Sequence, residues 1–313
     1  MTSSAKGPVD ILILGAGWTS TFLIPLCTSN NISYAATSRP SENDPSKPKT
    51  PDTILFEFDP NSDDPKPFEV LPKAKTVLIT FPIRVKGASE RLVRLYQETH
   101  AGDVNGEVLQ TAFIQLGSTG IWDKGPTFKG GPAKWFDRHT PYDSSNDRAI
   151  AEKELLELSS HTPTTVLNLC GLWGGERHPK HWVGRVAPSK EALRVKGGVH
   201  MIHGEDVSRA ILAVHSKFAL ANGQRWLLTN QRIYDWWELV STWGDQESKQ
   251  KVPDSERQEG DGEKGPHPRW VRELMVEEGV RVLPRNVEQM GSAKDSRDFW
   301  TTFDLDPVRT RFE

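Results

Sequence analysis

The sequence predicts an α/β protein with a doubly wound parallel sheet and a smaller C-terminal region. Two observations lead to this fold class: short apolar runs alternate with helical patterns over most of the chain, and the first apolar run ends directly in a glycine turn. A chain of 313 residues is long enough for one large unit or for two domains. We expect residues 8–170 to form the main sheet and residues 171–313 mainly the C-terminal region, with 201–230 returning to the main sheet.

The glycine turn predicts a nucleotide site. Residues 11–14 are four consecutive apolar side chains, as in a parallel strand that is buried on both faces. Gly15 and Gly17 then permit a tight turn close to a pyrophosphate, which would rest on the free amides of the helix that follows. A Gly-x-Gly after a strand also fits a plain strand-to-helix turn. Only the surrounding alternation of strands and helices favours the nucleotide site of a Rossmann-type fold over such a turn. The expected cofactor contacts here are Gly15, Gly17, Trp18, Thr19 and Ser20, the last in place of a third glycine.

The end of the second predicted strand, residues 32–38, indicates which dinucleotide binds. No Asp or Glu follows the strand to accept a hydrogen bond from a ribose 2′-hydroxyl. Ser38 and Arg39 stand there instead and suit a 2′-phosphate. The sequence therefore predicts that NADP(H) is preferred, with NAD(H) as the alternative. The competing interpretation of Arg39 is a surface residue that precedes a loop and binds no cofactor.

Further strands are predicted at residues 53–58, 76–81 and 112–116, with a helix at 88–96 between the last two, so the strands are expected to be parallel. Asp59 follows the third strand, where it would meet the adenine. Phe81 ends the fourth strand, where it would form a wall of the cofactor site.

Composition argues against several partner classes. The formal net charge is −3 and the basic residues are scattered, so no nucleic-acid partner is expected. Residues 1–8 lack the apolar segment of a signal peptide, and no apolar run reaches the length of a membrane span. We therefore expect a cytoplasmic protein whose partner is a small molecule. Cys27 and Cys170 are expected to be buried thiols, and no histidine spacing predicts a metal site.

The segment Gly117-Ser118-Thr119-Gly120-Ile121-Trp122 after the fifth strand resembles the extended short-chain dehydrogenase/reductases, which include NAD-dependent epimerase/dehydratase-like proteins. In that family a serine or threonine follows the strand, and an aromatic residue comes four positions later. Segments that begin near residues 140, 166, 201 and 227 resemble later parts of the family in the same order. The resemblance spans about residues 9–243. It implies that Ser118 is the catalytic serine and that a substrate pocket is lined by Trp122, Trp173, Arg177 and His178.

One departure from the family affects the chemistry. In the family alignment the tyrosine and lysine of Tyr-x-x-x-Lys fall on Asn146 and Ile150. Asparagine does not donate a proton to an alkoxide, and isoleucine can neither lower a neighbour's pKa nor bind a ribose hydroxyl. The chain thus resembles an atypical extended member. Tyr142, four residues earlier, is either a replacement acid or a structural tyrosine.

The leading interpretation is an NADP(H)-dependent oxidoreductase that acts on a small organic molecule. Two alternatives remain open: a non-catalytic NADP(H) sensor or scaffold, and a non-redox isomerase or cyclase on the same fold. The substrate-binding region is expected to carry a mobile polar insertion at residues 244–268, because that stretch has almost no apolar side chains.

Overall fold

The computed structural model describes residues 7–100, 110–123, 134–247 and 251–312. Its centre is a seven-stranded sheet in the order β11-β7-β5-β4-β1-β2-β3, in which every neighbouring pair is parallel. The strands are β1 (Val9–Leu14), β2 (Tyr34–Ser38), β3 (Ile54–Leu55), β4 (Ala74–Ile79), β5 (Ala112–Ser118), β7 (Thr164–Leu169) and β11 (Arg225–Leu228). The chain winds outward from β1 to β3 and then returns to β4 on the other side of β1. This doubly wound arrangement confirms the predicted fold class and creates a switch point between β1 and β4.

Two helical layers cover the sheet, and the side chains of β1 alternate between them. Ile11 and Ile13 pack with α1 (Ser20–Ser29) and α6 (Gly204–Ser216) on one face. Leu12 and Leu14 pack on the other face, in the cluster that includes α2 (Ala88–His100) and α3 (Asp147–Glu157). Burial on both faces explains why β1 reads as an uninterrupted apolar run. Helix α11 (Arg297–Phe303) adds its aromatic side chains to the α1 and α6 face.

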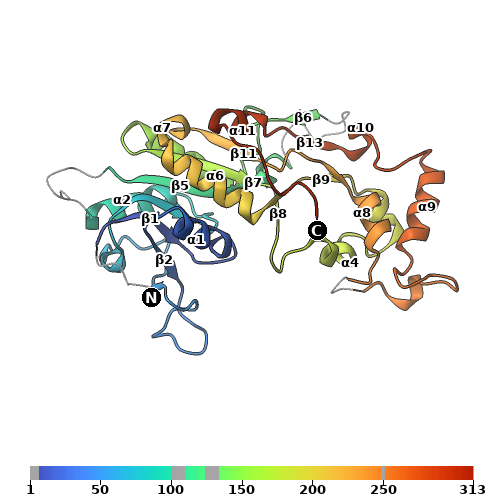
Figure 1. The fold of residues 1–313 in the computed structure, drawn as a ribbon, viewed down its shortest axis with the longest axis horizontal. Coiled ribbons are helices and arrows are strands. Elements are labelled where there is room, and N and C mark those ends of the chain that lie inside the picture. Colours follow the sequence, from blue (N-terminus) through green and yellow to red (C-terminus); the bar gives the residue numbers. More distant parts are fainter. Residues whose placement is uncertain (1–6, 101–109, 124–133, 248–250, 313) are drawn as a thin grey trace.

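The part of the C-terminal region that is expected to bind the substrate lies at the end of the molecule opposite β2 (Figure 1). We call it the substrate-side region. Its core contains Trp236 and Trp237 of α8 (Trp236–Trp243) and Trp270 of α9 (His267–Glu277). Its other elements are β8 (Gly171–Trp173), α4 (Val183–Val186), α5 (Lys190–Arg194), β9 (Gly198–Val199), β10 (Met201–His203), β12 (Tyr234–Asp235) and α10 (Val287–Met290).

The remaining elements are short. They are β6 (Lys134–Phe136), paired in parallel with β13 (Ser292–Lys294), the helix α7 (Phe218–Ala221), and the 3-10 turns at Lys66–Val70, Thr119–Trp122, Leu158–Ser160, Pro179–Trp182 and Asp254–Glu256. In the described part of the chain, no helix is long and apolar enough to cross a membrane.

Two expectations need correction. The third strand, predicted at residues 53–58, is only Ile54–Leu55, because this edge strand has a single neighbour and the chain then turns to pack Phe56 on Phe68. The polar stretch 244–268 is also not wholly solvated where it is described. Val252 is buried, and the buried Asp245 carboxylate binds the Arg257 guanidinium and the Val252 amide, at 3.3 Å for the latter. Apolar content alone therefore underestimated how much of this segment packs.

Candidate cofactor and substrate sites

A cavity of about 620 Å³ lies at the carboxyl ends of the strands beside the switch point. Open α/β sheets bind their ligands at this place. The turns after β1, β2, β3 and β4 all contribute to it, which is why residues far apart in sequence meet there. Its lining is Gly15, Ala16, Gly17, Thr37, Ser38, Arg39, Lys49, Thr50, Phe56, Glu57, Phe58, Thr80, Phe81 and Pro82.

The two glycines of the turn have different roles. Gly15 has a φ of +95°, and a Cβ there would lie 2.7 Å from Thr80 Oγ1. The turn is fixed by the Gly15 amide, which donates to Thr37 Oγ1 (3.1 Å), and by the Gly15 carbonyl, which accepts from Thr80 Oγ1 (2.6 Å). A Cβ on Gly17 would meet no atom within 4 Å. Gly15 is thus required by the protein itself, whereas Gly17 leaves open space on the cavity side.

The start of α1 offers free donors beside this space. Among the described residues, the backbone amides of Trp18 and Thr19 have no hydrogen-bond partner. The Ser20 side chain is buried, as expected for a small residue in place of the third glycine. The Trp18 indole N–H donates to the Gly174 carbonyl (3.0 Å), and the Arg177 guanidinium carbon lies 4.6 Å from the centre of the Trp18 ring. The glycine turn is therefore tied directly to the substrate-side loop.

Ser38 lines the cavity, but its hydroxyl is engaged within the protein, so its contact with the cofactor stays a prediction. Its hydroxyl accepts from the Thr50 amide (3.0 Å) and lies 2.8 Å from Thr53 Oγ1. Since Thr53 Oγ1 itself donates to the Thr50 carbonyl (2.6 Å), the Ser38 proton points to Thr53. Ser38 orders the loop after β2, and its one donor is already used.

The positive charges at this end of the cavity come from Arg39 and Lys49. The Arg39 side chain is exposed and so is accessible to a ligand. Lys49 was missed because it lies in a loop without periodicity. The bridge between Pro40 and Pro48 and the hydrogen bond from the Lys49 amide to the Arg39 carbonyl (2.8 Å) bring this loop back to the end of β2. Its ammonium lies 3.0 Å from the exposed Glu42 carboxylate. The sequence offered no signal for this return.

Asp59 is not at the cavity. Its carboxylate accepts from the Asn61 amide (2.9 Å) in a local turn, and Glu57 and Phe58 line the cavity instead. Asp59 is not among the residues that line this cavity, and its contact with the adenine stays a prediction. Phe81 lies in the cavity wall, stacked on Phe58 with ring centres 6.3 Å apart.

Ser118 stands at the carboxyl end of β5. Its Oγ accepts from the Gly120 amide (3.1 Å), which leaves the hydroxyl proton for another acceptor. Behind it, the Asn168 side chain donates to the Ser118 carbonyl (3.2 Å) and to both oxygens of Glu152 (2.9 Å each). A Cβ on Gly117 would lie within 2.5 Å of both the Asn168 and Glu152 side chains. The end of β5 is thus held by a buried polar cluster.

Helix α3 presents Arg148 and Glu152, four residues apart, to a cavity of about 10 Å³ between β5 and Pro82. Burial raises the pKa of Glu152, against the opposing effects of Arg225 and Asn168. Burial also lowers the pKa of Arg148. The sequence analysis missed this pair because the family alignment pointed to positions 146 and 150.

The residues at those two positions have other roles. Asn146 caps α3 by accepting from the Arg148 amide (3.0 Å), and Ile150 is half-buried. The helix contains no tyrosine. Its lysine, Lys153, is exposed and pairs with Glu157 at 3.5 Å.

Trp122 is not among the residues that line the cavities described here, and its place in a substrate pocket stays a prediction. It is fully buried, its indole N–H donates to the Thr140 carbonyl (2.9 Å), and it packs with Ile121 and Phe136. Tyr142 packs on the same cluster, with the Arg225 guanidinium carbon 4.1 Å from its ring centre. Tyr142 therefore has structural contacts, and its role as a proton donor stays a prediction.

The other predicted pocket residues lie near a cavity of about 320 Å³ on the substrate side. His178 lines this cavity, and its Nδ1 accepts from the Lys180 amide (3.1 Å). Trp173 is buried between His203 and Phe312, whereas Arg177 covers Trp18. His203, against which Trp173 packs, caps α6 by accepting from the Glu205 amide (3.1 Å).

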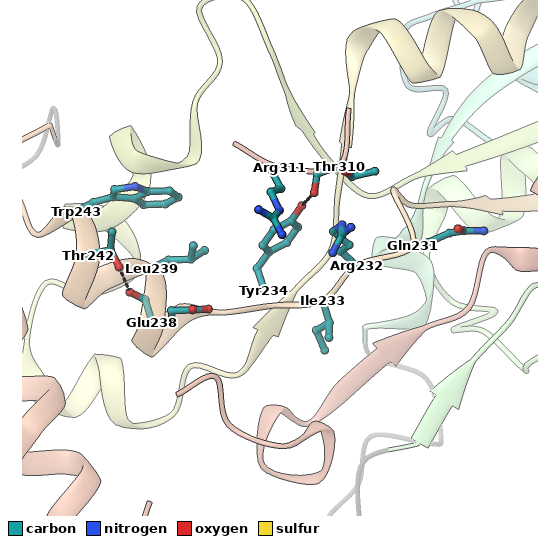
Figure 2. Close-up of a pocket in the computed structure, with 10 residues that line it drawn as sticks. All are labelled: Gln231, Arg232, Ile233, Tyr234, Glu238, Leu239, Thr242, Trp243, Thr310 and Arg311. Carbon is teal, nitrogen blue, oxygen red and sulfur yellow. Dashed lines mark hydrogen bonds between the residues drawn. The ribbon is translucent and has the colours of Figure 1, made fainter. Parts of the chain in front are cut away.

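A larger cavity of about 520 Å³ lies between β12, α8 and the C-terminal residues (Figure 2). Its lining is Gln231, Arg232, Ile233, Tyr234, Glu238, Leu239, Thr242, Trp243, Thr310 and Arg311. No periodic pattern in the sequence indicates this site, because residues near 310 form one of its walls.

No protein-family profile and no curated protein sequence matches the chain, but solved structures do. Vestitone reductase from alfalfa (Medicago sativa L.) has 15% sequence identity and a TM-score of 0.60, with 97% of this chain and 95% of the reductase covered. A UDP-glucose 4-epimerase has 13% identity and a TM-score of 0.60, with 96% and 93% covered. RMD from Pseudomonas aeruginosa, complexed with NADPH, has 10% identity and a TM-score of 0.55, with 96% and 94% covered. The resemblance read from the sequence is thus confirmed as a resemblance of fold: the chain has the Rossmann-type architecture that these reductases and epimerases share.

Proposed function

We propose that the protein binds NADP(H) and is an oxidoreductase that acts on a small organic molecule. The observation that carries this proposal is the cavity at the switch point, where open space at Gly17 meets the free amides of Trp18 and Thr19. A pyrophosphate fits these donors, because a helix N-terminus favours anions. Phe58 and Phe81 offer apolar walls, and Glu57 offers an acceptor for an adenine amino group in place of Asp59.

The preference for NADP(H) rests on Arg39 and Lys49. Both line the cavity where β2 ends, and neither Asp nor Glu follows β2 directly to bind a ribose 2′-hydroxyl. Two cations suit a 2′-phosphate. The nearby Glu42 would give up Lys49 to the phosphate, which costs little because an exposed ion pair is weak.

A bound nicotinamide supplies hydride transfer, and the protein supplies position and proton control. The Ser118 hydroxyl has a free proton with which to hold a substrate oxygen. The hydrogen bond from the Trp18 indole to the Gly174 carbonyl ties the loop 174–178 to the glycine turn, beside the start of α1. The cavity beside His178 in the C-terminal region would take the substrate.

The cofactor proposal is tested by titrating the protein with NADPH and NADH, with detection by calorimetry or nucleotide fluorescence. NADPH is expected to bind more tightly, and Arg39→Gln and Lys49→Gln should each weaken NADPH by about ten- to a hundredfold with little effect on NADH. Glu42→Gln, which frees Lys49, is the matched control and should not weaken NADPH. Equal affinities for the two cofactors would refute the preference.

Turnover separates an oxidoreductase from the second candidates, a sensor or a non-redox isomerase or cyclase. The Arg148 and Glu152 pair on α3, which holds neither tyrosine nor an inward-facing lysine, favours these alternatives. A panel of carbonyl and enone compounds should oxidise NADPH in the presence of the protein, and Ser118→Ala should abolish that oxidation. If no compound in the panel oxidises bound NADPH, a sensor or non-redox function replaces the proposal. Tyr142→Phe then shows whether this hydroxyl supplies the proton, since a general acid is worth about a hundred- to ten-thousandfold in rate.

A further inference from the structure

The last residues of the chain, 304–312, cross from the core to the substrate side, and we refer to them as the C-terminal tail. The carboxylate of Asp206, a fully buried residue at the start of α6, accepts from the amides of Val308 (2.8 Å) and Arg309 (3.0 Å). Farther along, the Tyr234 hydroxyl donates to the Thr310 carbonyl (2.9 Å). The tail is therefore fixed to both halves of the molecule (Figure 1).

Phe312 of the tail packs in a cluster of aromatic side chains. The Phe312 ring centre lies 4.4 Å from that of Tyr234, 5.1 Å from Trp173, 5.7 Å from Trp243 and 5.8 Å from His178. Aromatic pairs at these separations attract one another. With Phe312 and Thr310 both held, Arg311 between them is fixed in the wall of the 520 Å³ cavity.

Arg311 meets a second cation there, Arg232, which comes from the loop between β11 and β12. Within the described ranges, no carboxylate pairs with either guanidinium, whereas Arg285 and Arg309 each bind an acid. Burial raises the pKa of the Tyr234 hydroxyl, and the hydrogen bond from Asn230 and the positive charges of Arg232 and Arg311 oppose that rise. Both charges thus act on the same phenol, and two cations that line one cavity without an acidic partner favour an anion there.

The opposite wall of the cavity has a different chemistry. Figure 2 shows Glu238, Leu239, Thr242 and Trp243 on α8, across the cavity from Arg232. Burial and the neighbouring Asp235 raise the pKa of Glu238. This wall presents a hydrogen-bond acceptor, a hydroxyl and apolar surface, so the cavity is polarised rather than uniformly basic.

We propose that this cavity binds a small organic molecule through a carboxylate or phosphate group held by Arg232 and Arg311. The body of the ligand lies against Tyr234 and Trp243, and a hydroxyl or amine of the ligand faces Glu238. Because one of the two arginines belongs to the C-terminal tail, the tail is part of the binding site. The inference goes beyond the proposed function, since it needs no nicotinamide cofactor and no redox step.

The test uses the full-length protein and two probes, inorganic phosphate and citrate, titrated by calorimetry with and without saturating NADP⁺. At least one probe should bind with a Kd in the millimolar range or tighter, and binding should persist with NADP⁺ present. Arg232→Gln and Arg311→Gln should each weaken it about tenfold or more, because each removes a charge-assisted hydrogen bond. Arg281→Gln, an exposed arginine outside the cavity, is the matched control and should change nothing.

Phe312→Ala tests the role of the tail, because it frees Arg311 without removing its charge. It should weaken the probe about as much as Arg311→Gln does, with an unchanged circular dichroism spectrum. Binding of phosphate alone identifies a phosphate ligand, and binding of citrate alone identifies a carboxylate. The proposal fails if neither probe saturates, if binding disappears with NADP⁺ and so belongs to the glycine turn, or if the Arg232→Gln/Arg311→Gln double variant binds like the unaltered protein.

Discussion

At the scale of single residues, the two glycines of the glycine turn are needed for different reasons: Gly15 by the fold and Gly17 by the expected ligand. A side chain at Gly15 would be strained by the φ of +95° and would press on Thr80 Oγ1, whereas a side chain at Gly17 would enter open space. The two positions lie two residues apart, and the sequence motif treats them alike. Only the structure shows that they differ.

Gly17→Val should therefore give a folded protein that no longer binds a dinucleotide, because the valine side chain takes the space beside the Trp18 and Thr19 amides. Gly15→Val is the matched variant, and it should lower the thermal midpoint clearly. Circular dichroism melts report stability, and NADPH fluorescence reports binding. Normal NADPH binding by Gly17→Val would show that the turn is structural and would remove the basis of the cofactor proposal.

At the scale of elements, Asp10 of β1 joins three strands of the sheet. Its carboxylate accepts from the Ser33 amide (2.8 Å) just before β2 and pairs with Lys75 of β4 (2.7 Å). Burial raises the pKa of Asp10, but the hydrogen bonds from Lys75 and Ser33 outweigh burial and lower it to about 2. A lowered folded-state pKa stabilises the fold above the unfolded pKa, and this stabilisation is lost as the pH falls through the folded pKa.

Asp10→Asn should thus lower the free energy of unfolding by about 1–2 kcal/mol at pH 7, less than the full pKa shift implies because solvent screens this partly exposed pair. The difference in unfolding free energy between Asp10→Asn and the unaltered protein should shrink between about pH 4 and pH 2. In this range the Asp10 carboxylate of the unaltered protein takes up a proton, first in the unfolded and then in the folded state. Urea unfolding at pH 7 and near pH 2.5 measures both values. A difference that stays constant with pH would show that the carboxylate charge contributes nothing.

The elements also show how far the sequence predicts this fold. Strands β1, β4 and β5 were predicted because strands that are buried on both faces consist of nearly continuous apolar residues. The edge strand β3 was predicted to be too long. It pairs only with β2, and this pairing ends before the apolar pattern in the sequence does. The site residues that were missed, such as Lys49 and Arg311, lie on a loop and on the tail. Their positions depend on how the chain returns to the body, and local pattern does not carry this information.

At the scale of the whole molecule, a buried ion pair joins separate elements of the substrate-side region. The Arg285 guanidinium binds the fully buried Asp235 carboxylate (2.7 Å) and the Lys196 carbonyl (2.6 Å). Asp235 also caps α8 by accepting from the Trp237 amide (2.9 Å). The pair thus joins β12, α8 and the chain after α9, and none of these residues lines the cofactor cavity.

Arg285→Met should leave Asp235 buried without its partner and cost about 3–5 kcal/mol, the usual penalty for breaking a buried pair. The loss should fall on the substrate-side region, because the Arg285 guanidinium carbon lies 4.0 Å from the ring centre of Trp237 in the core of that region, while the cofactor cavity is built from the sheet. In increasing urea, tryptophan fluorescence of the variant should therefore change before NADPH binding is lost. Arg281→Gln, on the same segment but exposed, should match the unaltered protein. If the two signals of Arg285→Met change together, the two regions unfold as one cooperative unit, and a loss below about 1 kcal/mol would show that the pair is not needed to hold the substrate side.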